Sequence, residues 1–116
     1  MYKHEPKFYK SIKSFFFMIL IKIHKSYRDV IAICDSNLIR KYFEEDEFQL
    51  DIKESFFDGK NISEEKTIEL IKDMSREDAT FNIVGEKSVN CAIQAGIITQ
   101  EGVKKISGVP FALVLL

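Results

Sequence analysis

The sequence predicts an α+β domain, in which an antiparallel or mixed sheet is covered on one face by helices. Two observations predict this class. Predicted strand hairpins lie at both ends of the chain, and apolar residues recur at helical spacing in the middle. The expected order of elements is ββαβααββ. A chain of 116 residues is long enough for one ordinary core and too short for two, so one domain is expected.

The first half predicts a hairpin, a helix and a third strand. Isoleucines alternate with other side chains over 19–24, and an apolar run follows at 30–34. Asp35 and Ser36 are both suitable N-caps, because a side-chain oxygen accepts a backbone N–H. Apolar residues at helical spacing then predict a short helix ending near Glu44, with the acidic run 44–47 as its exit loop. Alternation over 48–52 predicts the third strand.

The second half predicts an aromatic turn over 56–60, two helices and a final pair of strands. Ser63 is the expected N-cap of the first of these helices. The segment 79–84 fits either a short helix or an extended connection. The next helix is expected to begin near Glu86 and to end before Gly96, a residue suited to the left-handed C′ position. The closing strands, 103–106 and 110–115, are joined around Ser107 and Gly108.

Residues 1–17 are expected to be a non-native or disordered extension, which leaves both Met1 and Met18 open as the native start. The charged and apolar residues near this end imitate a signal peptide. However, the apolar run has only seven residues, where a membrane span needs roughly 20. A cytoplasmic protein without a membrane anchor is therefore expected. Residues 18–116 carry 13 basic and 17 acidic side chains, so a basic arm for nucleic acid disappears with the extension.

Several short segments after Met18 carry a family resemblance. In chain order they are 30–35 with Leu38, 43–45, 50–51, 56–59, 78–86, and 108–110 with Ala112. In their order and spacing they resemble an archaeal family, the domain of unknown function 424 (DUF424). The resemblance implies lineage and fold but no established activity, and it suggests an association with translation. Phe111 stands where the family often has a histidine, which argues against a histidine-based mechanism.

No catalytic residue, metal site or cofactor is predicted. The two histidines and two cysteines lack the spacing of a zinc site. Cys34 and Cys91 each lie among apolar neighbours, as buried reduced thiols of cytosolic proteins do. The alternative is that Cys34, which lies next to a predicted helix start, is a nucleophile with His24 facing it as a base across the hairpin. The negative charge of Asp35 opposes the thiolate that this chemistry needs.

Gly85 leads into a predicted helix, and this start is the one candidate ligand site. Its backbone N–H groups, with Lys87 and Ser88 close by, predict contact with a phosphate or another anion. Asn82 either fixes the connection before the helix by bonding to the backbone or contacts the ligand. A single glycine is a weak phosphate motif, and Glu86 would repel an anion.

The leading functional hypothesis is a non-enzymatic module that binds a protein or ribonucleoprotein partner, with a link to translation. Lys41, Phe56 and Phe57 are the candidate partner contacts, although at least one phenylalanine is expected in the core. The alternative is direct RNA binding through lysines, which the net acidity of 18–116 disfavours; these lysines are Lys41, Lys87, Lys104 and Lys105. An enzyme that uses residues 82–87 is a third hypothesis, and the oligomeric state is left open.

Overall fold

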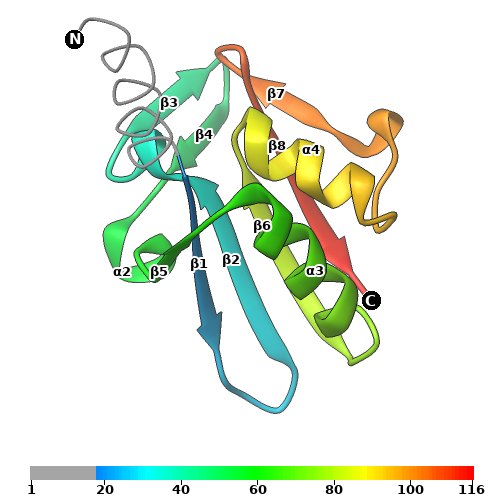
Figure 1. Cartoon of the computed structure of the whole chain (residues 1–116). Helices are drawn as coiled ribbons and strands as arrows, with labels where there is room; N and C mark the ends of the chain where they lie inside the picture. Colours follow the sequence, from blue (N-terminus) through cyan, green and yellow to red (C-terminus); the bar gives the residue numbers. More distant parts are fainter. Residues whose placement is uncertain (1–17) are drawn as a thin grey trace, which may run out of the picture.

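The computed structural model describes residues 18–116, so the prediction about residues 1–17 lies outside the described residues. A six-stranded sheet with strand order β5-β1-β2-β6-β8-β7 forms the centre of the fold (Figure 1). Adjacent strands are antiparallel except β2 and β6, which are parallel. In sheet order the strands are β5 (Lys60–Ile62), β1 (Ile19–His24), β2 (Asp29–Asp35), β6 (Ala79–Val84), β8 (Val109–Leu115) and β7 (Lys104–Ile106). The predicted α+β class with a mixed sheet is confirmed.

The larger core lies between one face of the sheet and the helices α3 (Glu64–Met74) and α4 (Glu86–Gln94) (Figure 1). Side chains alternate between the two faces of a strand. Ile31 and Ile33 of β2 and Phe81 and Ile83 of β6 therefore point to the same side, where all four are fully buried. The predicted caps of both helices are confirmed, because Ser63 Oγ accepts from the Lys66 N–H at 3.2 Å and Gly96 has φ +84°.

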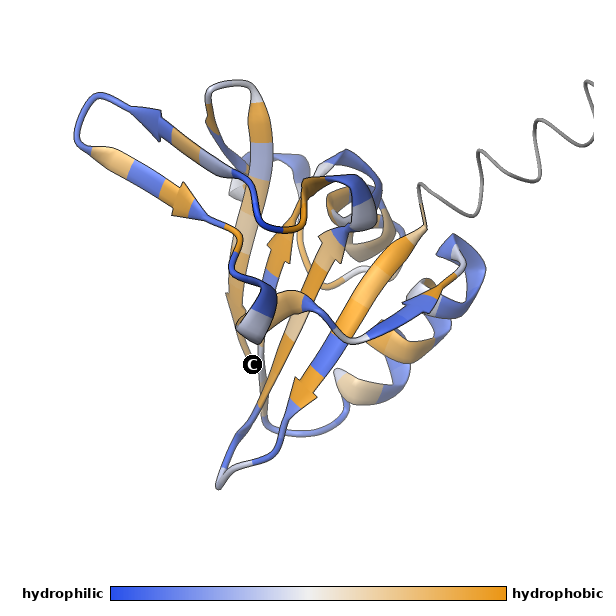
Figure 2. Ribbon diagram, turned by 90° about the vertical axis from the view of Figure 1, so that its left-hand side faces the viewer, coloured by the Kyte–Doolittle hydropathy of each residue, from blue (hydrophilic) through white to orange (hydrophobic). Residues whose placement is uncertain are grey.

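The opposite face of the sheet is covered only in part. A 3₁₀ turn (Ser36–Leu38), the hairpin β3 (Tyr42–Glu45) and β4 (Phe48–Asp51), and the short helix α2 (Glu54–Phe57) lie on this side. Figure 2 shows the β3–β4 hairpin projecting from the side of the sheet opposite α3. A second, smaller core forms beneath these elements; its buried members are Leu20, Ala32, Cys34, Ile52, Phe57 and Val84.

The predicted helix ending near Glu44 is wrong. Only a 3₁₀ turn follows β2, and residues 42–45 form strand β3 instead. Arg40 takes the left-handed conformation with φ +70°, which stops a right-handed helix. Phe43 then pairs with Leu50 across the hairpin. The acidic run is part of this hairpin, with Asp46 at φ +56° in its turn, rather than a helix exit loop.

One further segment differs from its prediction, and the structure settles the conformation of another that was ambiguous. The segment 56–60, predicted as an aromatic turn, contains the end of helix α2 and the first residue of edge strand β5. The ambiguous segment 79–84 is extended: β6 lies in the sheet between β2 and β8. The predicted first and last hairpins are both present, with Ser107 at φ +51° and Gly108 at φ +81° in the last turn. Among residues 18–116, no helix is both long and apolar enough to cross a membrane.

Candidate functional site

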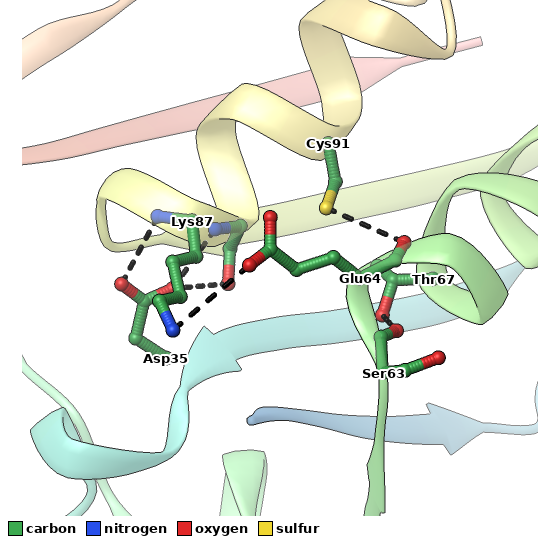
Figure 3. A network of polar contacts seen from close by, with 7 residues as sticks. Asp35, Ser63, Glu64, Thr67, Lys87 and Cys91 are labelled. Atoms are coloured by element: carbon green, nitrogen blue, oxygen red, sulfur yellow. Dashed lines mark hydrogen bonds and ion pairs between the residues drawn. The ribbon is translucent and has the colours of Figure 1, made fainter. Parts of the chain in front are cut away.

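The carboxyl ends of β2 and β6 meet, because these two strands run parallel, and α4 begins at this edge of the sheet. Asp35 ends β2, and its side chain points to the helix-covered face, as those of Ile31 and Ile33 do. Its carboxylate accepts hydrogen bonds from Ser88 N–H at 2.8 Å, Ser88 O–H at 2.8 Å and Lys87 N–H at 3.1 Å (Figure 3). Asp35 therefore caps α4, a helix that begins about fifty residues later.

Gly85 is the residue that makes this cap possible. It connects β6 to α4 with φ +108°, a conformation that L side chains rarely adopt. A Cβ atom at this position would lie 2.4 Å from Cγ of Asp35 and 2.6 Å from both carboxylate oxygens. The carboxylate thus occupies the space that a side chain at position 85 would need. The glycine serves to admit an internal carboxylate to the helix start.

The cap formed by Asp35 occupies the ligand site predicted at Gly85, Lys87 and Ser88. The structure brings these three residues together, but the N–H groups of Lys87 and Ser88 already donate to Asp35. A carboxylate therefore stands where the predicted phosphate would have bound. Asn82 lies elsewhere: it pairs with Ala32 and Leu113 in mid-sheet, on the face opposite α4. Sequence reasoning found the glycine, but it assigned Asp35 to the wrong helix.

A polar network continues from the cap towards α3. The Lys87 ammonium lies 3.9 Å from a carboxylate oxygen of Glu64, and Cys91 Sγ lies 3.7 Å from the Glu64 backbone carbonyl (Figure 3). Beside this network runs an open cleft of about 450 Å³ with basic, acidic and amide side chains; its lining includes Glu64, Glu86, Lys87, Asn90, Gln100 and Lys105. Within residues 18–116, no three potential metal-binding side chains are grouped together.

Cys34 and Cys91 are both buried and unpaired by disulfides, as predicted. Burial raises the pKa of the Cys34 thiol to about 12, and the neighbouring Asp35 and Asp58 charges act in the same direction. Burial also raises the pKa of the Cys91 thiol to about 12, together with the charge of Glu64. Both side chains are therefore neutral thiols near pH 7. This protonation state disfavours either one as a thiolate nucleophile.

The two buried thiols predict a loss of stability at alkaline pH. In the unfolded chain a thiol ionises near its ordinary pKa of about 8.5, whereas the folded state holds the proton to a pKa of about 12. Between these values the folded state binds more protons, so the unfolding free energy falls as pH rises. We expect urea unfolding from pH 8 to pH 11 to show this fall. A double variant, Cys34→Ala with Cys91→Ala, should show a smaller slope; an unchanged slope would contradict the assignment.

A second feature, which we call the hairpin groove, separates the β3–β4 hairpin from β7 and β8. It has a volume of about 450 Å³ and is mostly apolar; it is lined by Glu45, Phe48, Lys104, Lys105, Ile106 and Phe111. Phe48 is 67% exposed although it is a large apolar side chain. Ser107 fixes the two walls relative to each other. Its N–H donates to Glu45 Oε1 at 2.6 Å and its O–H donates to the Glu44 carbonyl at 2.7 Å.

The predicted partner contacts Lys41, Phe56 and Phe57 do not line this groove. Phe57 is buried in the smaller core, so the expectation that at least one phenylalanine packs there is confirmed. Phe56 stacks on the His24 ring at a centroid distance of 4.6 Å. Lys41 is exposed at the base of the hairpin, and its backbone bonds to Leu38 and Ile52. The hairpin groove was missed because its walls are far apart in sequence.

These features define a class of α+β protein built on one mixed sheet. In this class a carboxylate at the end of one strand of a parallel pair caps the helix that follows the other strand. A family described as "Protein of unknown function (DUF424)" matches residues 23–116, and the chain belongs to this family, as predicted. A crystal structure of an uncharacterized conserved protein from Methanopyrus kandleri has a TM-score of 0.75 at 23% identity, covering 84% of this chain and 91% of that chain. At this identity the likeness shows the fold alone. No curated protein matches the chain.

Proposed function

We propose that this protein is a binding module whose hairpin groove receives an apolar segment of a protein partner. The observation that carries the proposal is the exposed Phe48 beside a mostly apolar groove of about 450 Å³. Burying apolar surface contributes roughly 25 cal/mol per Å², and aromatic anchors at the centre of an interface supply much of its affinity. Ser107 supports this role, because its two bonds to the hairpin hold the groove open before a partner arrives.

The charges around the groove favour a particular kind of segment. Lys104 is exposed on the β7 wall of the groove, where it pairs with Phe111, whereas the next residue, Lys105, points to the other face of β7, towards the cleft beside α4. Lys104 complements a partner segment in which an acidic residue lies next to one bulky apolar side chain. The family resemblance suggests that this partner belongs to the translation machinery, alone or within a ribonucleoprotein.

RNA binding is the second candidate, since Lys104 and Lys105 are also suited to phosphate contacts. The hairpin opposes it. Four consecutive acidic residues, 44–47, form the end of the hairpin beside the groove, and they would repel a phosphate backbone. The described residues carry four more acidic than basic side chains. A protein segment with a few acidic residues matches this arrangement better than a continuous polyanion does.

Replacing Phe48 with serine is expected to reduce partner binding at least tenfold, because the partner loses its aromatic contact at the groove. The measurement is quantitative recovery of co-purifying proteins from an archaeal extract with tagged wild-type and Phe48→Ser protein, with and without nuclease. Tyr27→Ser is the matched control, since Tyr27 is an exposed aromatic residue remote from the groove. Protein recovery that survives nuclease and depends on Phe48 supports the proposal. Recovery that is lost with nuclease, or is equal for both variants, overturns it.

A further inference from the structure

The outer half of the β3–β4 hairpin, residues 44–49, is not held in place by burial. Every residue of this half is exposed, whereas Phe43 and Leu50 of the inner half pack against the smaller core. Figure 2 shows the hairpin projecting away from the main sheet. A two-stranded hairpin is at best marginally stable by itself in water. The position of the outer half therefore depends on polar contacts with the rest of the protein.

Ser107, in the turn between β7 and β8, supplies these contacts. Its N–H donates to Glu45 Oε1 at 2.6 Å and its O–H donates to the Glu44 carbonyl at 2.7 Å; we call this pair of bonds the Ser107 latch. Within residues 18–116, Ser107 is the one residue outside the segment 40–54 that hydrogen-bonds to the outer half. Both bonds are exposed, so each contributes modestly and can open in the native protein.

The backbone at Ser107 favours a role for this serine in the latch rather than in its own turn. Ser107 and Gly108 both have positive φ, +51° and +81°. Two-residue hairpin turns of this kind favour asparagine, aspartate or glycine at the first position, because other side chains are strained there. The hydroxyl bond to Glu44 offsets this strain. A strained residue that contacts a second element indicates a functional constraint.

We propose that the outer half of the hairpin is a movable wall of the hairpin groove, held in place by the Ser107 latch. With the latch closed, Glu45 and Phe48 form the wall opposite Ile106 and Phe111. With the latch open, the outer half moves away from β7 and the groove loses this wall. Opening and closing of the latch thus switch the groove between a formed and an unformed state.

The base of the hairpin stays in place in both states. The Arg40 N–H donates to the Ile52 carbonyl at 2.8 Å, and the Ile52 N–H donates to the Lys41 carbonyl at 2.9 Å. Ile52 is fully buried in the smaller core. The movement is therefore confined to the outer half, and it requires much less free energy than unfolding of the whole domain.

The latch also sets the affinity of the groove for a partner, a consequence that rests on the proposed function. A partner that needs both walls binds only molecules in which the latch is closed. Its apparent dissociation constant therefore rises in inverse proportion to the closed fraction. Ser107 is not among the residues that line the groove. Its replacement should weaken partner binding without removing a side chain of the groove lining.

Amide hydrogen exchange of the full chain, followed by NMR, tests the latch with no partner present. Ser107→Gly removes the hydroxyl bond and suits the positive φ, and adding Glu45→Ala removes the second acceptor. We expect the protected amides of 43–50 to exchange about fivefold faster in the single variant and at least about tenfold faster in the double variant. The amides of β2 and β6 should keep their wild-type rates.

Ser75→Ala is the matched control, because Ser75 Oγ donates to the Lys72 carbonyl at 2.8 Å at the end of α3, remote from the hairpin. It should leave exchange of 43–50 unchanged. Equal hairpin exchange in wild type and double variant, or acceleration spread equally over β2 and β6, overturns the latch. Neither result depends on a partner, so failure of the latch and failure of the proposed groove binding are separate outcomes.

Discussion

Replacing Gly85 with alanine is expected to destabilise the protein by about 3 kcal/mol, through steric overlap and backbone strain together. The added methyl group would lie 2.4 Å from Cγ of Asp35, a contact that forces either the carboxylate or the start of α4 to move. The backbone at Gly85 also has φ +108°, outside the conformations that alanine prefers. Urea unfolding monitored by circular dichroism measures the change in unfolding free energy.

Gly96→Ala separates these two causes. Gly96 also has a positive φ, +84°, but no atom lies within 4 Å of a Cβ built on it. Its replacement should cost only the left-handed conformation of one residue, about 1 kcal/mol. If both alanine variants lose the same stability, the carboxylate does not occupy the space beside Gly85, and the proposed reason for that glycine fails.

Replacing Asp35 with alanine is expected to cost about 3 kcal/mol of unfolding free energy, mainly from the start of α4. The change removes the acceptor of three hydrogen bonds, from Lys87 N–H, Ser88 N–H and Ser88 O–H. Ser88 is fully buried, so its two donors lose their partner without gaining water. The Asp35→Ala change also removes a negative charge from the positive end of the α4 dipole. Thermal and urea unfolding of the purified variant provide the measurement.

Ser63→Ala is the control for this experiment, because Ser63 caps α3 with one local bond to Lys66 N–H and is only partly buried. It should cost about 1 kcal/mol, the ordinary value of an N-cap. Asp35→Asn keeps one carbonyl oxygen as an acceptor and should lie between the two. Equal losses for Asp35→Ala and Ser63→Ala would mean that the cap from β2 adds nothing beyond a local one.

Local patterns were enough to predict much of this fold. Alternation identified β1 and β4, the turn at Ser107 and Gly108 identified β8, and caps such as Ser63 and Gly96 identified two helices, because each signal depends on residues adjacent in sequence. The helix predicted after β2 failed for a physical reason. Apolar residues at 38, 39, 42 and 43 match helical spacing. However, Arg40 has a left-handed backbone conformation, which cannot continue a right-handed helix, and Phe43 pairs with Leu50 in a hairpin. Tertiary pairing overrode the local pattern.

The candidate sites show where sequence reasoning ends. Gly85 was recognised as a special position, since a glycine before a helix is visible in the sequence. Its true neighbour, Asp35, is brought there by the parallel pairing of β2 with β6, which no local pattern reveals. The hairpin groove likewise joins Phe48 to Phe111, residues from opposite halves of the chain. A site formed by segments far apart in the sequence can be predicted only when the strand order of the sheet is known.

The cap on α4 also has a consequence for how the sheet is assembled. Side chains change face at every residue of a strand, so a one-residue slip of β2 against β6 would turn Asp35 away from the helix. The start of α4 would then lose its acceptor, and a carboxylate would enter the smaller core, where Cys34 and Val84 now lie. The cap therefore favours the correct register, because the start of α4 has its hydrogen-bond acceptor only when β2 and β6 are aligned as observed.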